Sequence, residues 1–127
     1  MNYDRIPSCI YLEPEIACIG LTEEKAREKC ANVKVGKFSL AGNGKSLAEG
    51  DTSGLFKVIL DGDTGEILGV HLYGLHVTDM IGELSVAMNN ELTAEELIHS
   101  IHPHPTVSEA IGEAFMAAWT GRAVNSL

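Results

Sequence analysis

The fold is decided by residues 55–73, which read LFKVILDGDTGEILGVHLY. Apolar and β-branched residues dominate positions 55–60 and 67–73, and the stretch DGDTG between them holds the residue types that form turns. Two strands joined by so short a connection pair as an antiparallel hairpin. These residues therefore predict two neighbouring strands of an antiparallel sheet.

Further strand patterns precede this hairpin, and helix patterns follow it. Strands are expected at residues 8–12, 16–20 and 33–40, and residues 41–46 are expected to form a loop. Helices are expected at residues 22–30, 77–90, 93–100 and 106–120. Because the last three helices follow without a strand between them, the sequence predicts a single α+β domain over residues 1–127. We expect a two-layer sandwich, with an antiparallel sheet and helices packed on one face.

The composition argues against several classes of function. The chain carries 18 Asp and Glu against 9 Lys and Arg, a net charge of −9, whereas nucleic acids and anionic membranes are bound by clustered basic residues. No apolar run approaches the roughly 20 residues of a membrane span, and residues 1–11 lack the apolar segment of a signal peptide. Three cysteines without a CxxC pair are expected to be reduced thiols, which favours a cytoplasmic protein.

The stretch Gly42-Asn43-Gly44-Lys45-Ser46 resembles part of a phosphate-binding loop. A P-loop requires glycine at the position that Ser39 occupies, and a GxGxxG loop requires glycine where Leu47 stands. We therefore expect a glycine turn that binds no phosphate.

Residues 101–110, with the sequence IHPHPTVSEA, admit two interpretations. The structural one is a helix start, in which Thr106 and Glu109 form a capping box and the prolines precede the helix. This interpretation leaves His102 and His104 without a role. The functional interpretation makes His104 a general base and Glu109 the carboxylate that holds its ring.

The functional interpretation rests on ordinary acid–base chemistry. An imidazole, with a usual pKa of about 6.5, can accept a proton from a thiol with a usual pKa of about 8.5. A carboxylate on the second ring nitrogen fixes the tautomer and stabilises the imidazolium. A metal site formed by His99, His102 and His104 is a weaker alternative, because their spacing matches no standard zinc pattern. We expect no metal.

Residues 104–109, His-Pro-Thr-Val-Ser-Glu, resemble the His-Pro-Thr-x-x-Glu signature of the flavin-dependent pyridine nucleotide–disulfide oxidoreductases. The likeness runs nearly from end to end of the chain, through residues 6–11, 14–17, 20–23, 50–58, 67–71, 80–84 and 93–97. Residues 102–106 are most similar to lipoamide dehydrogenases, where Ala commonly takes the place of Pro103. Leu75 departs from the pattern, since many members have Pro there, but the change affects only a turn.

This resemblance implies the dimerisation domain of a homodimeric flavoenzyme that uses FAD and NAD, of the dihydrolipoamide dehydrogenase type. It implies that His104 is the acid/base toward the substrate thiol in the partner subunit's active site, with Glu109 as its carboxylate. It further implies that the main chain at His104 and Pro105 contacts the flavin, and that the bond between them is cis. The implied partners are the FAD and NAD domains of the parent and the lipoyl domains of a 2-oxoacid dehydrogenase complex.

The elements that would carry electrons are missing from these residues. The sequence contains no glycine-rich flavin fingerprint and no CxxxxC redox pair. We therefore expect the chain alone to bind no FAD or NAD and to be inactive. Two alternatives stay open: a stand-alone, non-enzymatic binding module of the same fold, and the same domain from glutathione reductase or another disulfide reductase.

Overall fold

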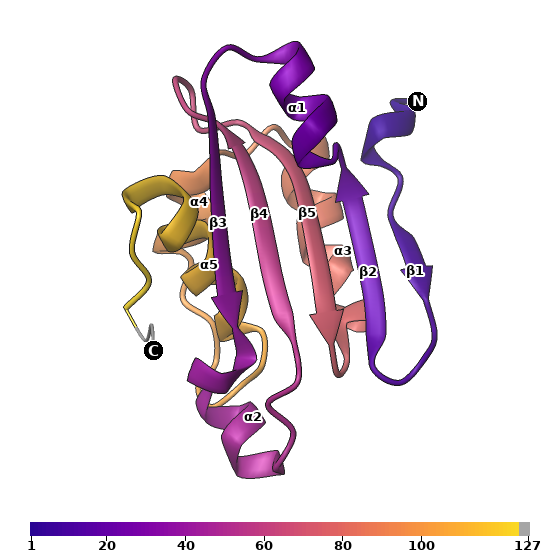
Figure 1. Ribbon diagram of the computed structural model, residues 1–127, viewed down its shortest axis with the longest axis vertical. Helices are drawn as coiled ribbons and strands as arrows, with labels where there is room; N and C mark the ends of the chain where they lie inside the picture. Colours follow the sequence, from indigo (N-terminus) through magenta and orange to yellow (C-terminus); the bar gives the residue numbers. More distant parts are fainter. Residues whose placement is uncertain (125–127) are drawn as a thin grey trace.

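Five strands form one antiparallel sheet in the computed structural model, which describes residues 1–124. They are β1 (Ser8–Ile10), β2 (Glu15–Gly20), β3 (Val33–Ser39), β4 (Leu55–Asp61) and β5 (Ile67–Gly74). Their order across the sheet is β1-β2-β5-β4-β3, so the second strand of the expected hairpin is the central one (Figure 1). The predicted pairing of β4 with β5 is confirmed, with a shift of register between Ile59 and Leu60.

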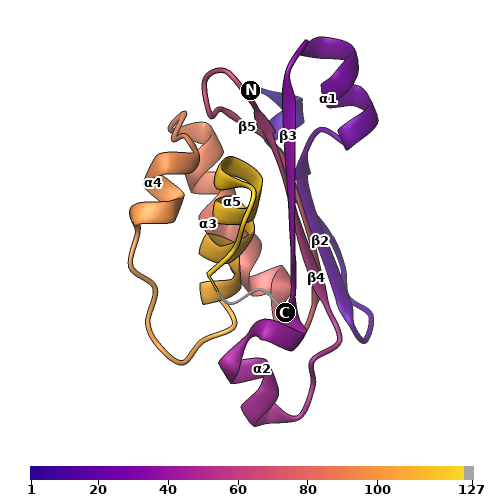
Figure 2. The ribbon, with the colours of Figure 1, turned by 60° about the vertical axis from the view of Figure 1, so that its left-hand side comes forward.

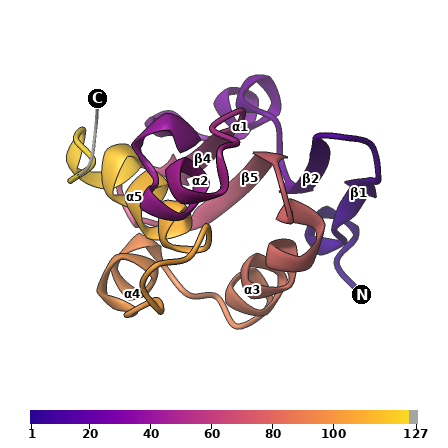
Figure 3. The same ribbon diagram turned by 90° about the horizontal axis from the view of Figure 1, so that it is seen from below.

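Three helices of the described chain lie on one side of this sheet (Figure 2). They are α3 (Val77–Asn89), α4 (Ala94–His99) and α5 (Glu109–Thr120). Seen from below, α5 lies against β3 and β4, α3 lies under β2 and β5, and α4 lies beside α5 (Figure 3). The predicted α+β sandwich is confirmed. None of the helices in residues 1–124 has the length and hydrophobicity needed to cross a bilayer.

The helix α1 (Glu23–Lys29) is an addition on the opposite side of the sheet (Figure 2). It begins where predicted, because the hydroxyl of Thr22 accepts a hydrogen bond from the Lys25 N–H at 3.3 Å. Its Ala26 packs with Ile59 and Leu68 in a small second core. The predicted layer of helices on one face is therefore confirmed, and α1 adds a short helix to the other face.

The prediction of a loop at residues 41–46 is wrong. A short 3-10 helix, η2 (Leu40–Gly42), leads directly into α2 (Gly44–Glu49), and a first 3-10 helix, η1 (Tyr3–Arg5), lies near the N-terminus. Asn43 begins α2 as its N-cap, accepting a hydrogen bond from the Ser46 N–H at 2.9 Å. A helix of this length spans less than two turns, too few for an apolar periodicity to reveal it.

The main core fills the space between the sheet and the layer of α3 and α5. Its fully buried side chains include Phe56, Val58, Leu60, Leu84, Ile111 and Phe115. Successive residues of a strand point to opposite faces, so Val58 contributes to this core whereas Ile59 points towards α1. Burying each such large apolar side chain contributes about 1.5–3 kcal/mol.

Gly36 allows α5 to lie directly against β3. A Cβ atom at Gly36 would lie 2.1 Å from the nitrogen of Ala118 and 2.7 Å from the carbonyl oxygen of Ala114. Both are backbone atoms of the helix, so no side-chain rotation could make room. The absence of a side chain at Gly36 thus sets how closely α5 packs, and with it the position of Glu109, the first residue of α5.

We expect Gly36→Ala to destabilise the domain by about 3 kcal/mol or more, because the added methyl group must displace the backbone of α5. Gly82→Ala in α3 is the matched control. A Cβ atom there has no neighbour within 4 Å, so alanine should stabilise the helix by up to about 1 kcal/mol. Denaturant unfolding of both variants measures the difference. If the two variants are equally stable, α5 does not pack as closely on β3 at Gly36 as the structure has it.

Candidate functional site

The candidate residues lie on the connection 100–108, which joins α4 to α5 and passes below them towards α2 (Figure 2). We call this segment the histidine loop. Its outer positions are open to solvent: Ile101 is 98% exposed, and the side chain of His104 is 75% exposed. Val107 points inward and is part of the main core. The loop therefore presents His104 at the surface while remaining attached to the interior.

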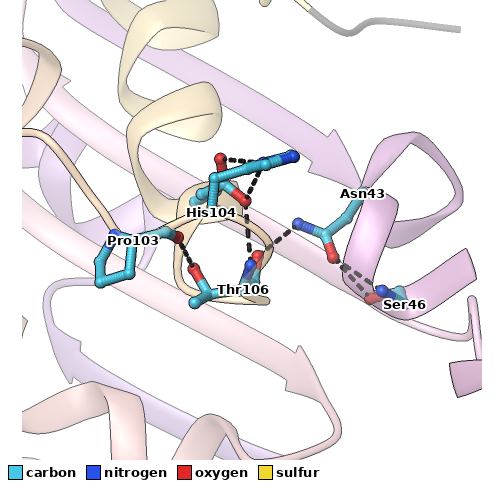
Figure 4. A network of polar contacts seen from close by, with 6 residues as sticks. Asn43, Ser46, Pro103, His104 and Thr106 are labelled. Atoms are coloured by element: carbon cyan, nitrogen blue, oxygen red, sulfur yellow. Dashed lines mark hydrogen bonds and ion pairs between the residues drawn. The ribbon is translucent and has the colours of Figure 1, made fainter. Parts of the chain in front are cut away.

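His104 and Glu109 are in direct contact, as the functional interpretation requires. The Nδ1 atom of His104 lies 2.9 Å from Oε1 and 3.1 Å from Oε2 of Glu109. The chain turns sharply between them, and the His104–Pro105 peptide bond is cis, as the resemblance implied. Figure 4 shows the second ring nitrogen of His104 pointing away from the carboxylate.

The surroundings of Glu109 favour its ionised form. Partial burial raises the pKa of Glu109, but hydrogen bonds from the Thr106 N–H and the His104 ring, with the nearby histidines, lower it by more. The pKa therefore lies below its usual value, and the carboxylate is ionised at neutral pH. An ionised carboxylate only accepts hydrogen bonds, so Nδ1 of His104 must be the donor. In the neutral ring, Nε2 is then free of its proton and can act as a base.

The capping box predicted for Thr106 and Glu109 forms only in part. The Glu109 carboxylate does accept a hydrogen bond from the Thr106 N–H at 3.0 Å. The Thr106 hydroxyl, however, donates to the carbonyl oxygen of Pro103 at 2.6 Å. The prediction that the last helix begins at Thr106 is therefore wrong, and α5 begins at Glu109. Glu109 orders the histidine loop and holds the ring of His104 at the same time.

A second histidine–carboxylate pair fixes the start of the histidine loop. The Nε2 atom of His102 lies 2.7 Å from Oε1 of Glu83 on α3, and the His102 side chain is only 12% exposed. Sequence analysis missed this contact, because Glu83 is 19 residues away on another helix. The three histidines of the metal alternative face three different carboxylates, with His99 near Glu95. Within residues 1–124, no three potential ligands gather into a metal site.

Asn43 is a further residue of the site that sequence analysis missed. Its amide Nδ2 donates a hydrogen bond to the carbonyl oxygen of Thr106 at 3.0 Å (Figure 4). The same residue caps α2, so the stretch first considered for phosphate uses its polar group to contact the histidine loop instead. Asparagine is one of the residues preferred at a helix N-cap, so Asn43 could have indicated the start of α2 from the sequence. It could not have indicated the contact with Thr106, which is 63 residues away.

Comparison with known proteins identifies the fold that carries this site. The family described as "Pyridine nucleotide-disulphide oxidoreductase, dimerisation domain" matches residues 6–115. The chain belongs to this family. The family that the sequence resembled is thereby confirmed.

The dimerisation domain is similar to several enzymes of known class. It is 50% identical to a dihydrolipoyl dehydrogenase of Rhizobium etli, over 96% of this chain and 25% of that protein. Among solved structures, LpdA from Mycobacterium tuberculosis superposes with a TM-score of 0.84 at 22% identity, covering 91% of this chain and 25% of the other. The HOCl-induced flavoprotein disulfide reductase RclA from Escherichia coli superposes with a TM-score of 0.82 at 30% identity, covering 87% of this chain and 25% of the other.

The chain spans about a quarter of the length of these relatives. The likeness to LpdA, at 22% identity, bears on the fold alone. Together the comparisons identify a dimerisation domain of the kind found in dihydrolipoyl dehydrogenase-like disulfide reductases.

Proposed function

We propose that this chain is the dimerisation domain of a dihydrolipoyl dehydrogenase-like flavoenzyme and that it donates His104 and Glu109 to the active site of the partner subunit. The observation that carries the proposal is the state of His104. Its Nδ1 is held by an ionised carboxylate, while the ring is 75% exposed and its Nε2 is turned outward. An enzyme excludes water around a general base during catalysis. A second protein surface closing over His104 would provide this exclusion.

The chemistry of the pair is a proton transfer. In oxidation of dihydrolipoamide, Nε2 of His104 would take the proton from a substrate thiol and leave the thiolate, which is the nucleophile in disulfide exchange. The resulting imidazolium would be stabilised by the Glu109 carboxylate 2.9 Å from Nδ1. In the reverse direction the same nitrogen would return the proton. These residues move protons and carry no electrons.

The electron carriers, FAD and NAD, would be bound by other parts of the flavoenzyme. In residues 1–124 no buried side-chain nitrogen or oxygen lacks a hydrogen-bond partner, so the interior of this domain offers no vacant set of cofactor ligands. The residues suited to contact a flavin are His104 and Pro105, because both are exposed on the histidine loop. When bound, the flavin would supply the electron acceptor for the thiolate chemistry.

The proposed assembly is a homodimer. The apolar residues Ile111, Ala114 and Phe115 of α5 are buried in the domain's own core, so they are not available for a contact between subunits. The residue that better supports a contact between subunits is Ile101, which is 98% exposed and lies three positions before His104 on the histidine loop. A large apolar side chain next to a shared active site is suited to a subunit contact.

Other partners follow from the same proposal. The FAD and NAD domains of the flavoenzyme would contact this domain directly, and lipoyl domains of a 2-oxoacid dehydrogenase complex would deliver the substrate thiol. We place the flavoenzyme in the cytoplasm, where the free thiols of Cys9, Cys18 and Cys30 would stay reduced. The 50% identity to a dihydrolipoyl dehydrogenase favours this assignment over a disulfide reductase of the RclA type, at 30%.

The purified chain should bind no flavin and should not oxidise dihydrolipoamide with NAD. The reason is the lack of a flavin fingerprint and of a redox cysteine pair in its sequence. Absorption spectra after extensive dialysis and a standard turnover assay measure both properties. A yellow protein with a stable flavin band would overturn this part of the proposal.

The chain should self-associate through a surface that includes Ile101. Ile101→Glu should weaken the dimer by about tenfold or more, since burying an unpaired charge at an interface centre costs well over 1.4 kcal/mol. Leu12→Glu is the matched control. Like Ile101, Leu12 is an exposed, branched apolar side chain outside the helices and strands, but it lies far along the chain from the histidine loop. Sedimentation velocity over a range of concentrations gives the dissociation constants. Equal effects of the two changes, or a monomer at every concentration, would contradict the proposed surface.

In the complete flavoenzyme, His104→Ala should slow the thiol–disulfide half-reaction by a factor on the order of 100 or more, the usual contribution of a general base. Glu109→Ala should cost less, because the imidazole remains and only its orientation and the stabilisation of its charge are lost. Flavin reduction by NADH should change little in both variants, since no substrate thiol loses a proton there. Rapid-mixing kinetics of each half-reaction measure these rates.

Thermal melts of the same variants test the purely structural interpretation. Loss of a helix-end hydrogen bond would lower stability by about 1 kcal/mol and leave turnover per folded molecule unchanged. If both variants melt early and retain normal thiol turnover, His104 and Glu109 are structural residues and the proposed function is wrong.

A further inference from the structure

We propose that Asn43 is a positioning residue for His104, holding the histidine loop in the conformation in which Glu109 reaches the imidazole. This inference rests on the proposed function and extends it to a residue on a different element, at the start of α2. Asn43 does not touch the ring. It acts through the main chain of Thr106, whose carbonyl oxygen accepts the hydrogen bond from its amide.

The burial of Asn43 is unusual in this domain. Among the residues the structure describes, the polar side chains that are fully buried are those of Asn43, 4% exposed, and Ser46, 2% exposed. A buried amide is costly unless its donors and acceptors are paired. Both of these side chains belong to one hydrogen-bonded group that faces the histidine loop (Figure 4).

The capping of α2 explains only half of Asn43. Its Oδ1 accepts hydrogen bonds from the Ser46 N–H at 2.9 Å and from the Ser46 hydroxyl at 3.0 Å. A serine, threonine or aspartate would provide such an acceptor equally well. The amide nitrogen is not needed for the cap, and it donates to Thr106, a residue 63 positions away. The contact to the histidine loop is therefore what distinguishes asparagine from the other capping residues here.

Ser46 fixes which way the amide points. The main-chain N–H of Ser46 can only donate, so the end of the amide that it meets must be the oxygen. A flipped amide would place its NH₂ group against the Ser46 N–H and its oxygen against the carbonyl of Thr106, losing both of these bonds. The nitrogen is thus aimed at Thr106 by the geometry of α2.

Thr106 passes this constraint on to the ring of His104. Its carbonyl oxygen is held by Asn43, and its N–H is held by Oε2 of Glu109 at 3.0 Å. The other oxygen of that carboxylate lies 2.9 Å from Nδ1 of His104. The Thr106 peptide groups are therefore fixed on both sides, so a shift of Thr106 would move the carboxylate and the imidazole relative to each other.

The two contacts with α2 and α3 hold the histidine loop on either side of its exposed centre. His102 pairs with Glu83 before His104, and Asn43 bonds Thr106 after it. The anchor at Asn43 is itself firmly placed, because the adjoining η2 inserts Leu40 into the main core. The backbone at His104 is therefore held in position although the His104 side chain is exposed.

Asn43→Ser in the complete flavoenzyme tests the inference. Serine still caps α2 but has no amide to reach Thr106. We expect kcat of the thiol half-reaction to fall about tenfold, less than in His104→Ala, because misplacing a catalytic group is costly. KM for dihydrolipoamide should stay unchanged, since Asn43 binds no substrate, and flavin reduction by NADH should keep its rate. Asn43→Thr, which also caps α2 and has no amide donor, should behave alike and serves if the serine variant fails to assemble.

Two comparisons separate positioning from mere support of the fold. Ser46→Ala removes the hydroxyl's buried hydrogen bond, while the main-chain N–H at position 46 still orients the Asn43 amide towards Thr106, so the thiol half-reaction should stay within about twofold of the unmodified rate. Asn43→Ser combined with Glu109→Ala should be hardly slower than Glu109→Ala alone, because both changes break the same line of contacts.

The inference is overturned if Asn43→Ser keeps full thiol turnover, if Ser46→Ala matches it, or if its effect multiplies with that of Glu109→Ala. His104→Ala, measured beside these variants, distinguishes a failure of the proposed function from a failure of the role proposed for Asn43. If His104→Ala leaves the thiol half-reaction intact, the proposed function itself fails. If it slows that reaction and Asn43→Ser does not, only the role of Asn43 is refuted.

Discussion

The contact between α5 and the backbone of β3 at Gly36 is the constraint on which the rest of this domain depends. With no side chain between them, the helix sinks onto the sheet until Ala114 and Ala118 touch the strand. That depth completes the main core, and it also sets the height of the helix's first residue, Glu109. The position of a surface carboxylate is thus decided by a glycine in the middle of a strand.

The contacts of Glu109 order the histidine loop, which has few buried apolar side chains of its own. One carboxylate receives both the main chain of Thr106 and the ring of His104, and contacts from α2 and α3 secure the flanking residues. The arrangement places rigid polar contacts beneath an imidazole that is itself open to solvent. The proposed sharing of His104 with a second subunit would need this combination, since each half would have to keep its geometry before the other arrives.

What the sequence could predict depended on how local each feature is. The β4–β5 hairpin and the helix α3 were predictable because strand alternation, turn residues and helical periodicity extend over enough residues. The His104–Glu109 pair was predictable because five positions separate its members and a family signature spans them. The α2 helix was missed because it is too short to show periodicity. The roles of Asn43 and Glu83 depend on partners 63 and 19 residues away, which no local pattern encodes. Thr106 misled because α5 begins three residues later, at Glu109, and the Thr106 hydroxyl donates to the carbonyl oxygen of Pro103.

The bond between Asn43 and Thr106 has a consequence for protein engineering. Segments that lie far apart in the chain meet there, so the histidine loop is not a portable module. If residues 100–109 were transplanted into a related scaffold, the carbonyl oxygen of Thr106 would lack its hydrogen bond unless that scaffold has an amide donor at the position of Asn43. The transferable unit therefore includes residues 40–46 and 100–109 together with the partner of His102, Glu83, and a chimera designed with all three would retain the contacts that position His104.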